Sequence, residues 1–372
     1  MRIVVKVGTS LLTDKHYQLD RVFIRNLVKQ IAEMERAGHK VILVSSGAVA
    51  SGRQELSIKH EKKNIPFRQA LAAVGQGLLI ETYRKFFKKY RISVAQALLT
   101  SLDFTRRENF LNTKHVFELL LEKGVVPIVN ENDVTTIEAL TFGGNDMLSA
   151  YVAAMVSADY LVIFTDVDGL LSKGKVVPVV EKIDDSVKAL AGGARSRHSI
   201  GGMTAKLEAA KYAVSSCVSM FIVNGRRKNI LKKVVESCET RGTLLSNYSF
   251  LPAKNPGTFF PSSVSCIDSQ KKWMKPQIKK NTWIEIDAGA AKALKKSGKS
   301  LLSSGIAKIH GEFNRGDVVA VKGQYGEVAY GQINYGSSDL DKIKHCRSDE
   351  IEDILGFSFE PEAMHRDRMV IL

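Results

Sequence analysis

Short runs of apolar, mostly β-branched residues alternate with longer stretches of helical periodicity from the N-terminus to about Tyr248. Each apolar run stops at small or polar residues, as strands buried on both faces of a parallel sheet do. The predicted strands are Arg2–Val7, Val41–Val44, Ile92–Leu99, Val125–Val129, Tyr160–Phe164 and Ser219–Val223. The predicted helices are Asp20–Ala37, Pro66–Tyr90, Asp103–Lys123, Leu148–Ala158 and Leu207–Ser215. This alternation predicts an α/β fold, a three-layer αβα sandwich with a mainly parallel central sheet.

The chain changes character after Leu251, where prolines and a basic segment around Trp273 interrupt the pattern. Beyond this point the predicted elements are short: strands at Trp283–Ile286, Ile306–Ile309, Val318–Val321 and Val328–Ile333, and helices at Ala288–Lys296, Asp339–Ile343 and Ser348–Leu355. A length of 372 residues also favours two domains. We therefore expect a first domain over residues 1–252, a linker over 253–276, a small β-barrel-like domain over 277–357 and a C-terminal tail over 358–372.

Composition narrows the class of protein. With 44% hydrophobic and 25% charged residues, the chain has the balance of a soluble globular protein. It contains no apolar run long enough to cross a membrane and begins in a strand without a signal peptide, so we expect a cytoplasmic location and no membrane partner. The four cysteines form no CxxC pair, and the histidines show no HxxxH spacing, so no metal site is assigned to the protein. The net charge of +15 predicts anionic partners, but does not choose among nucleotides, carboxylates, phosphates and nucleic acid.

The stretch from Pro127 to Ser149 carries the first candidate site. A buried strand ends there at Asn130–Asp133, and a second polar group, Gly144–Asp146, opens the next helix. In open α/β sheets the ligand crevice lies at the carboxyl ends of the strands. Two polar clusters flanking one loop therefore predict a substrate site, although each alone could be an ordinary strand end or helix cap.

Three further segments combine glycine, hydroxyl and lysine residues in the way that phosphate sites do. They are Lys6 with Gly8-Thr9-Ser10, the small-residue segment Ser45–Gly52, and Gly201–Lys206 at a predicted helix start. The strand before Thr165 ends in Asp166 and Asp168, which are compatible with Mg²⁺, with the ribose or base of a nucleotide, or with an ordinary Asp-Gly turn. No Walker A loop and no GxGxxG fingerprint is present.

Taken in order, these motifs resemble those of the amino acid kinase family. They are Val5–Ser10, Ser45–Ala48, Asn130–Asp133, Gly144–Asp146, Thr165-Asp166 and Gly201–Lys206. Within the family, the resemblance implies phosphorylation of the γ-carboxylate of L-glutamate by ATP, the first step of proline synthesis. The C-terminal part resembles a PUA domain.

The resemblance implies a role for each matching residue. Lys6 and Lys206 are expected to contact the ATP phosphates, with Asp146 orienting both. Ser46, Asp133 and Asn145 are expected to hold glutamate. The remaining ATP-binding residues are expected to be Gly8, Thr165, Asp166, Ile200, Gly201, Gly202, Met203, Thr204 and Ala205. Ile200 and Ala205 stand where relatives commonly carry threonine. Mg²⁺ is expected to arrive with ATP.

The resemblance further implies inhibition by proline and a homo-oligomer, a dimer or tetramer. The reaction would need no general base, because a γ-carboxylate with a pKa of about 4.3 is already an anion at neutral pH. Two alternatives stay open at this stage. One is another member of the family, acting on aspartate, UMP or a small phosphate. The other is an RNA-binding PUA protein with a degenerate kinase domain.

Overall fold

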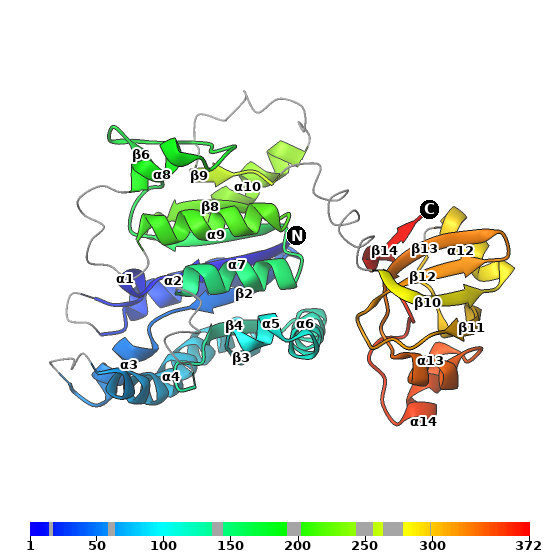
Figure 1. Ribbon diagram of the computed structural model, residues 1–372. Helices are drawn as coiled ribbons and strands as arrows, with labels where there is room; N and C mark the ends of the chain where they lie inside the picture. The colour runs from blue at the N-terminus through cyan, green and yellow to red at the C-terminus, as the bar shows by residue number, and fades with distance from the viewer. Residues whose placement is uncertain are drawn as a thin grey trace. The chain divides into compact units, whose positions relative to one another are not determined.

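The structure is a computed structural model that describes residues 1–14, 18–58, 64–135, 144–191, 202–242, 256–262, 278–297 and 299–372. The chain divides into two units, Met1–Ser263 and Val264–Leu372 (Figure 1). None of the helices in the described ranges is long and apolar enough to cross a membrane.

The first unit is built on a seven-stranded sheet in the order β3-β4-β2-β1-β5-β8-β9. Every neighbouring pair in it is parallel except β8 and β9. The strands are β1 (Arg2–Val7), β2 (Lys40–Ser45), β3 (Val94–Leu99), β4 (Val126–Glu131), β5 (Tyr160–Thr165), β8 (Ser219–Asn224) and β9 (Gly257–Phe260). A separate two-stranded ribbon pairs β6 (Leu171–Ser172) with β7 (Lys175–Val176).

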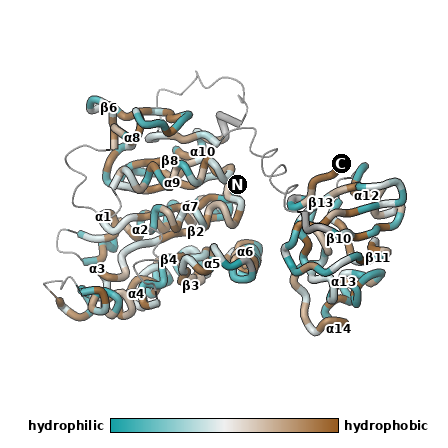
Figure 2. Tube along the Cα trace, in the orientation of Figure 1, coloured by the Kyte–Doolittle hydropathy of each residue, from teal (hydrophilic) through white to brown (hydrophobic). Residues whose placement is uncertain are grey.

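Helices cover both faces of this sheet, as Figure 1 shows. They are α1 (Thr9–Leu12), α2 (Arg21–Arg36), α3 (Ala48–Glu55), α4 (Ile65–Lys88), α5 (Leu102–Thr105), α6 (Arg107–Glu122), α7 (Asn145–Met155), α8 (Asp185–Ala191), α9 (Met203–Ser215) and α10 (Ile230–Gly242). Helices α2, α4 and α10 share one hydrophobic core with the sheet, and α6, α7 and α9 share the other. Alternating hydrophobic and hydrophilic bands along these helices show the inner and outer faces (Figure 2). The first unit is thus the expected αβα sandwich.

The second unit contains a five-stranded mixed sheet in the order β11-β10-β12-β13-β14. Its elements are β10 (Ile278–Ile286), α12 (Ala288–Ser297), η4 (Ser303–Gly305), β11 (Ile306–His310), β12 (Val318–Gly323), β13 (Gly326–Gln332), α13 (Ser337–Ile343), η5 (Ser348–Glu350), α14 (Ile351–Leu355), η6 (Arg366–Arg368) and β14 (Met369–Ile371). Its strands and helices enclose a hydrophobic core of their own.

The structure differs from the expected domain boundaries at two places. Strand β9 lies inside the range 253–276 expected as a linker, because Gly257–Phe260 pairs with β8 and Phe260 is fully buried. Strand β14 lies inside the range 358–372 expected as a tail, because Met369–Ile371 pairs with β13. The predicted helix Asp103–Lys123 is also divided, since Arg106 adopts an extended conformation between α5 and α6.

Candidate active site

The residues predicted to form the site lie where the parallel strands end. Lys6 is near the end of β1, Ser46 follows β2, Asp133 follows β4, and Thr165 ends β5. Helices α7 and α9 carry the remaining residues in their first turns: Asn145 and Asp146 in α7, and Lys206 in α9. Ile200 and Gly201 lie outside the described residues.

Lys6, Asp146 and Lys206 form a buried cluster. The Lys6 ammonium lies 2.6 Å from Asp146 Oδ1, and the Lys206 ammonium lies 3.1 Å from Asp146 Oδ2. Their exposed fractions are 6%, 2% and 8%, so both ion pairs are shielded from water. Two lysines 200 positions apart in sequence therefore meet on one carboxylate, and the three side chains together carry more positive than negative charge.

Burial lowers the pKa of Lys6 below its ordinary value, because desolvation disfavours the ammonium. The charge of Asp146 raises this pKa and the nearby Lys206 lowers it again. An additional anion placed against Lys6 and Lys206 would stabilise their charged forms. The three side chains of the cluster contribute two positive charges and one negative charge, which favours an anionic ligand.

Glycines open the helices around this cluster. Gly8, Gly47, Gly144 and Gly202 are the N-caps of α1, α3, α7 and α9, and none offers a side chain to cap the first backbone N–H groups. A Cβ on Gly8 would lie 3.4 Å from the Lys6 ammonium, so glycine keeps the space above that group open. Helix starts of this kind bind anions through free N–H groups and the helix dipole.

A chain of side-chain hydrogen bonds runs beside the lysine cluster. Asn145 Nδ2 donates to Ser46 Oγ at 2.8 Å and to Asn130 Oδ1 at 3.0 Å, and Asn130 Nδ2 donates to Gln76 Oε1 at 3.0 Å. The backbone N–H of Glu131 also donates to Asn130 Oδ1, which fixes the orientation of every amide in the chain. Within the described parts of the chain, Asn145 Oδ1 and Gln76 Nε2 are consequently a buried acceptor and a buried donor that have no hydrogen-bond partner.

Gln76 is a site residue that sequence reasoning did not assign. Gly75-Gln76-Gly77 lies inside the predicted helix Pro66–Tyr90, and the sequence assigns Gln76 no role there. A glutamine in the middle of α4 gives no sign that it faces the end of β4 until the helix is packed on the sheet. Its 8% exposure and its bond to Asn130 place it in the same network as Asn145.

Asp133 stands in the turn after β4. Burial raises the pKa of its carboxyl above the ordinary value, and the charge of Arg68 opposes that shift in part. A cation bound beside Asp133 would favour its ionised form.

The loop after β5 is tied to the end of β8. Thr165 Oγ1 donates to Asp166 Oδ1 at 3.2 Å, and Asp166 itself is exposed. Asp168 accepts a hydrogen bond from Asn224 Nδ2 at 2.9 Å and pairs with Arg227 at 2.9 Å. These contacts hold the loop in place while leaving Asp166 accessible.

Comparison with known protein families identifies the class of protein to which this fold and lysine cluster belong. A family model described as "Amino acid kinase family" matches residues 1–224, and one described as "PUA domain" matches residues 282–355. The chain belongs to the amino acid kinase family.

Curated relatives match the whole chain. Glutamate 5-kinase of Caldanaerobacter subterraneus subsp. tengcongensis is 45% identical over 380 residues, with 100% of this chain and 98% of the relative covered. Glutamate 5-kinase of Thermoanaerobacter pseudethanolicus is 44% identical over 380 residues with the same coverage. Glutamate 5-kinase of Dehalococcoides mccartyi is 38% identical over 382 residues, again with 100% and 98% covered.

Proposed function

We propose that this chain transfers the γ-phosphoryl group of ATP to the γ-carboxylate of L-glutamate, giving γ-glutamyl phosphate and ADP. The proposal is supported by relatives of this name along the full chain and by the family match over residues 1–224. The single observation that carries the chemistry is the pair of buried ammonium groups on Asp146. Such a transfer brings two anions together and needs positive charge between them.

In this proposal the lysines share one task. Lys6 and Lys206 neutralise the charge that spreads over the oxygens of the transferred phosphoryl group, and Asp146 holds both ammonium groups on the same side. The uncapped starts of α3 and α9 add backbone N–H donors. The attacking carboxylate is already ionised near neutral pH, so alignment and charge neutralisation account for catalysis without a general base.

The carboxylates in the first turn of α7 and after β5 limit how a metal ion could be held. Asp146 is engaged by two lysines, and Asp168 by Asn224 and Arg227, whereas Asp166 is exposed. This donor set fits Mg²⁺ that is carried by the ATP phosphates, with Asp166 placed to contact it or its waters. When bound, Mg²⁺ would neutralise phosphate charge.

Recognition of glutamate is assigned to the amide network and Asp133. An amino acid presents both a cation and an anion, and the network offers an unused acceptor on Asn145 and an unused donor on Gln76. Asp133 suits the α-ammonium, since a bound cation offsets the cost of its buried charge. Ser46 lies between these groups and the start of α3.

Turnover assays test the proposal directly. ADP release is measured with glutamate, aspartate, UMP and carbamate, each with ATP and Mg²⁺, and activity is expected with glutamate. Lys6→Ala and Lys206→Ala are expected to lower kcat about a hundredfold or more, since each removes one of two charges on the transition state. Each variant leaves Asp146 with one lysine, so the fold is expected to persist by circular dichroism. Lys85→Ala, which removes an exposed lysine of α4, is the control.

Near-normal kcat in either site variant would remove that lysine from the mechanism, and a preference for another acceptor would reassign the substrate.

We further propose that proline inhibits the enzyme and that the chain assembles as a dimer or tetramer. The same turnover assays with added proline test the inhibition, and size-exclusion chromatography with light scattering tests the assembly.

A further inference from the structure

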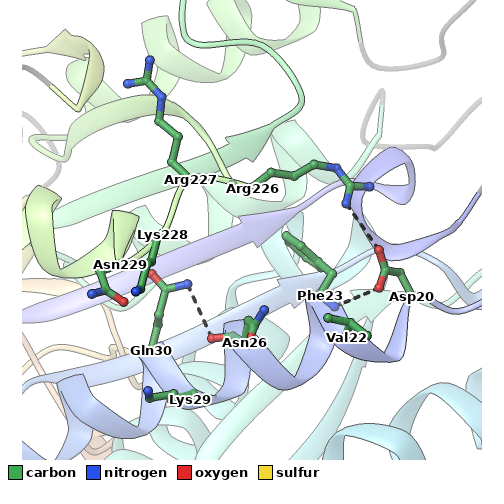
Figure 3. A pocket seen from close by; sticks show the side chains of 11 residues that line it. Asp20, Val22, Phe23, Asn26, Lys29, Gln30, Arg226, Arg227, Lys228 and Asn229 are labelled. Atoms are coloured by element: carbon green, nitrogen blue, oxygen red, sulfur yellow. Dashed lines mark hydrogen bonds and ion pairs between the residues drawn. The ribbon is translucent and has the colours of Figure 1, made fainter.

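A pocket of about 400 Å³ lies between α2 and Gly225–Asn229, the segment that joins β8 to α10 (Figure 3). This volume is in the range of sites for small molecules. The residues that line it include four cations and one carboxylate: Lys29, Arg226, Arg227, Lys228 and Asp20. The pocket is therefore strongly positive, and none of these residues is assigned a contact with ATP or glutamate in the proposed active site.

These cations lie close to one another and to the N-terminus of α10, and this arrangement of like charges is electrostatically unfavourable. Arg226, Arg227 and Lys228 come directly before α10, and a helix N-terminus favours negative rather than positive charge. The carboxylate of Asp20 already has two partners: it accepts a hydrogen bond from the N–H of Phe23 at 2.9 Å and forms an ion pair with Arg226 at 3.3 Å. A bound anion would relieve the repulsion among these positive groups.

The lysines are the cations most free to meet a ligand. Arg227 points away from α2 in Figure 3 and pairs with Asp168. Among the residues that the structure describes, Lys29 makes only an exposed ion pair at 3.9 Å with Glu33, which contributes little free energy. Within the described residues Lys228 has no ion pair or hydrogen bond, and Figure 3 shows it beside Gln30 and Asn229.

We propose that this pocket binds a small phosphate-bearing metabolite, whose phosphate groups meet Lys29 and Lys228. The side-chain amides of Asn26 and Asn229 add polar partners at the same place. Phe23 supplies an apolar wall, with the Arg226 guanidinium 5.7 Å from its ring, for the part of the ligand that carries no charge.

The pocket also has a route to the proposed nucleotide site. Arg226 donates to the backbone oxygen of Ser10 at 3.4 Å, within the α1 turn that follows Gly8, and Arg227 pairs with Asp168 after β5. An anion bound beside Arg226 and Arg227 would weaken the attraction of these guanidinium groups for their partners in both loops. Occupancy is then linked to nucleotide affinity, a step that rests on the proposed function.

The acetylation rate of each lysine shows where the ligand binds, and this measurement does not depend on enzyme turnover. The full chain is treated with a limiting acetylating reagent, with and without inorganic pyrophosphate as the probe, and the rate at each lysine is read by mass spectrometry. At a concentration about ten times the Kd, the rates at Lys29 and Lys228 are expected to fall about tenfold, because only the empty pocket reacts. Lys85 and Lys232 are exposed controls outside the pocket and are expected to keep their rates.

A variant separates this site from pyrophosphate bound elsewhere. In Lys29→Ala, half-maximal protection of Lys228 is expected to need about tenfold more pyrophosphate, as expected for loss of one charged hydrogen bond, whereas Lys85→Ala leaves it unchanged. Equal rates at Lys29 and Lys228 with and without pyrophosphate would overturn the proposal, as would protection that Lys29→Ala does not weaken.

The linkage has its own test. The KM for ATP is compared with and without pyrophosphate in the native chain and in Lys29→Ala/Lys228→Ala, so that competition at the nucleotide site cancels. For each protein, the KM for ATP with pyrophosphate is divided by the KM without it. If this ratio differs about fivefold between the two proteins, the linkage is supported; equal ratios reject it. If glutamate is not the acceptor, the same comparison is made with the Kd for ADP, and the acetylation result stands by itself.

Discussion

At the scale of single residues, the site depends on one carboxylate between two ammonium groups. Asp146 is 2% exposed and has a lysine on each oxygen. A buried charge costs several kcal/mol unless it is paired, and Asp146 offsets part of this cost for both lysines. An additional anion completes the charge balance, which is why the cluster suits phosphate.

The pKa of Lys6 leads to a prediction about pH. Burial lowers it from 10.5, so kcat is expected to fall with rising pH before an ordinary lysine loses its proton. Between the lowered pKa and 10.5, the unfolded chain binds a proton that the folded chain has lost, so the free energy of unfolding rises with pH. Activity and stability are thus expected to change in opposite directions over the same window, measured by kcat and by urea denaturation.

The variant Lys6→Arg tests whether Lys6 is the group whose deprotonation lowers kcat at alkaline pH. Arginine stays charged beyond pH 12, so the variant is expected to lose the alkaline fall even though its kcat is lower. Lys85→Arg, on the exposed face of α4, is expected to keep the native profile. An unchanged alkaline fall in Lys6→Arg would assign it to another group.

Gln76 gives a second prediction at this scale. Gln76→Ala removes the unused donor and is expected to raise the KM for glutamate about tenfold, since a hydrogen bond to a charged group contributes about 1.5 kcal/mol. The KM for ATP is expected to stay near the native value. Arg84→Ala, an exposed change on the same helix, is the control. An equal rise in both KM values would indicate a structural role instead.

At the scale of elements, two glycines of α4 have different environments. A Cβ on Gly75 would lie 1.9 Å from the backbone oxygen of Ala48 and 2.1 Å from the nitrogen of Gly52, whereas a Cβ on Gly77 would have no neighbour within 4 Å. Gly75 therefore permits the close crossing of α3 and α4. Helix α3 begins beside Ser46, so this crossing also positions the proposed site.

This contrast predicts opposite effects of one substitution. Gly75→Ala is expected to destabilise the protein by about 1–3 kcal/mol, because backbone on both helices must move. Gly77→Ala is expected to stabilise it by up to about 1 kcal/mol, since alanine favours the helix and meets no obstacle. Urea denaturation measures both changes. Equal effects would show that the crossing is not as close as Gly75 suggests.

The individual elements also show how much of the fold and of the candidate site could be predicted from the sequence. Most strands of the parallel sheet were predicted because they are buried apolar runs, as β5 and β8 illustrate. Strand β9 was missed because Gly257–Phe260 is four residues long and follows prolines, so only its pairing with β8 reveals it. In the site, Lys6, Asp146 and Lys206 were predicted from motifs, but Gln76 was not, because helix packing alone brings it to Asn130.

At the scale of the whole molecule, the two units have separate cores, and every described contact of the proposed site lies within Met1–Ser263. The second unit does not offer an open aromatic surface at Trp283. His310 stacks on that ring at 4.4 Å, and the Lys322 ammonium lies 4.1 Å from its centroid. A nucleic-acid base stacking on Trp283 would have to displace one of these groups.

The separation predicts that the second unit is dispensable for the chemical step. A chain that ends after Ser262 keeps β9 and the hydrogen bonds between Ser262 and Ser219, so the edge of the first sheet remains paired. Its kcat with glutamate, ATP and Mg²⁺ is expected to stay within about threefold of the full chain, because no lysine or amide of the site is removed. Thermal denaturation and light scattering are measured in parallel, so that a loss of assembly or folding is distinguished from a loss of chemistry. A folded, correctly assembled truncation with kcat reduced more than about tenfold would mean that the second unit supplies a group to the reaction. Unchanged turnover combined with salt-dependent RNA binding by residues 278–372 would instead assign that unit a separate partner.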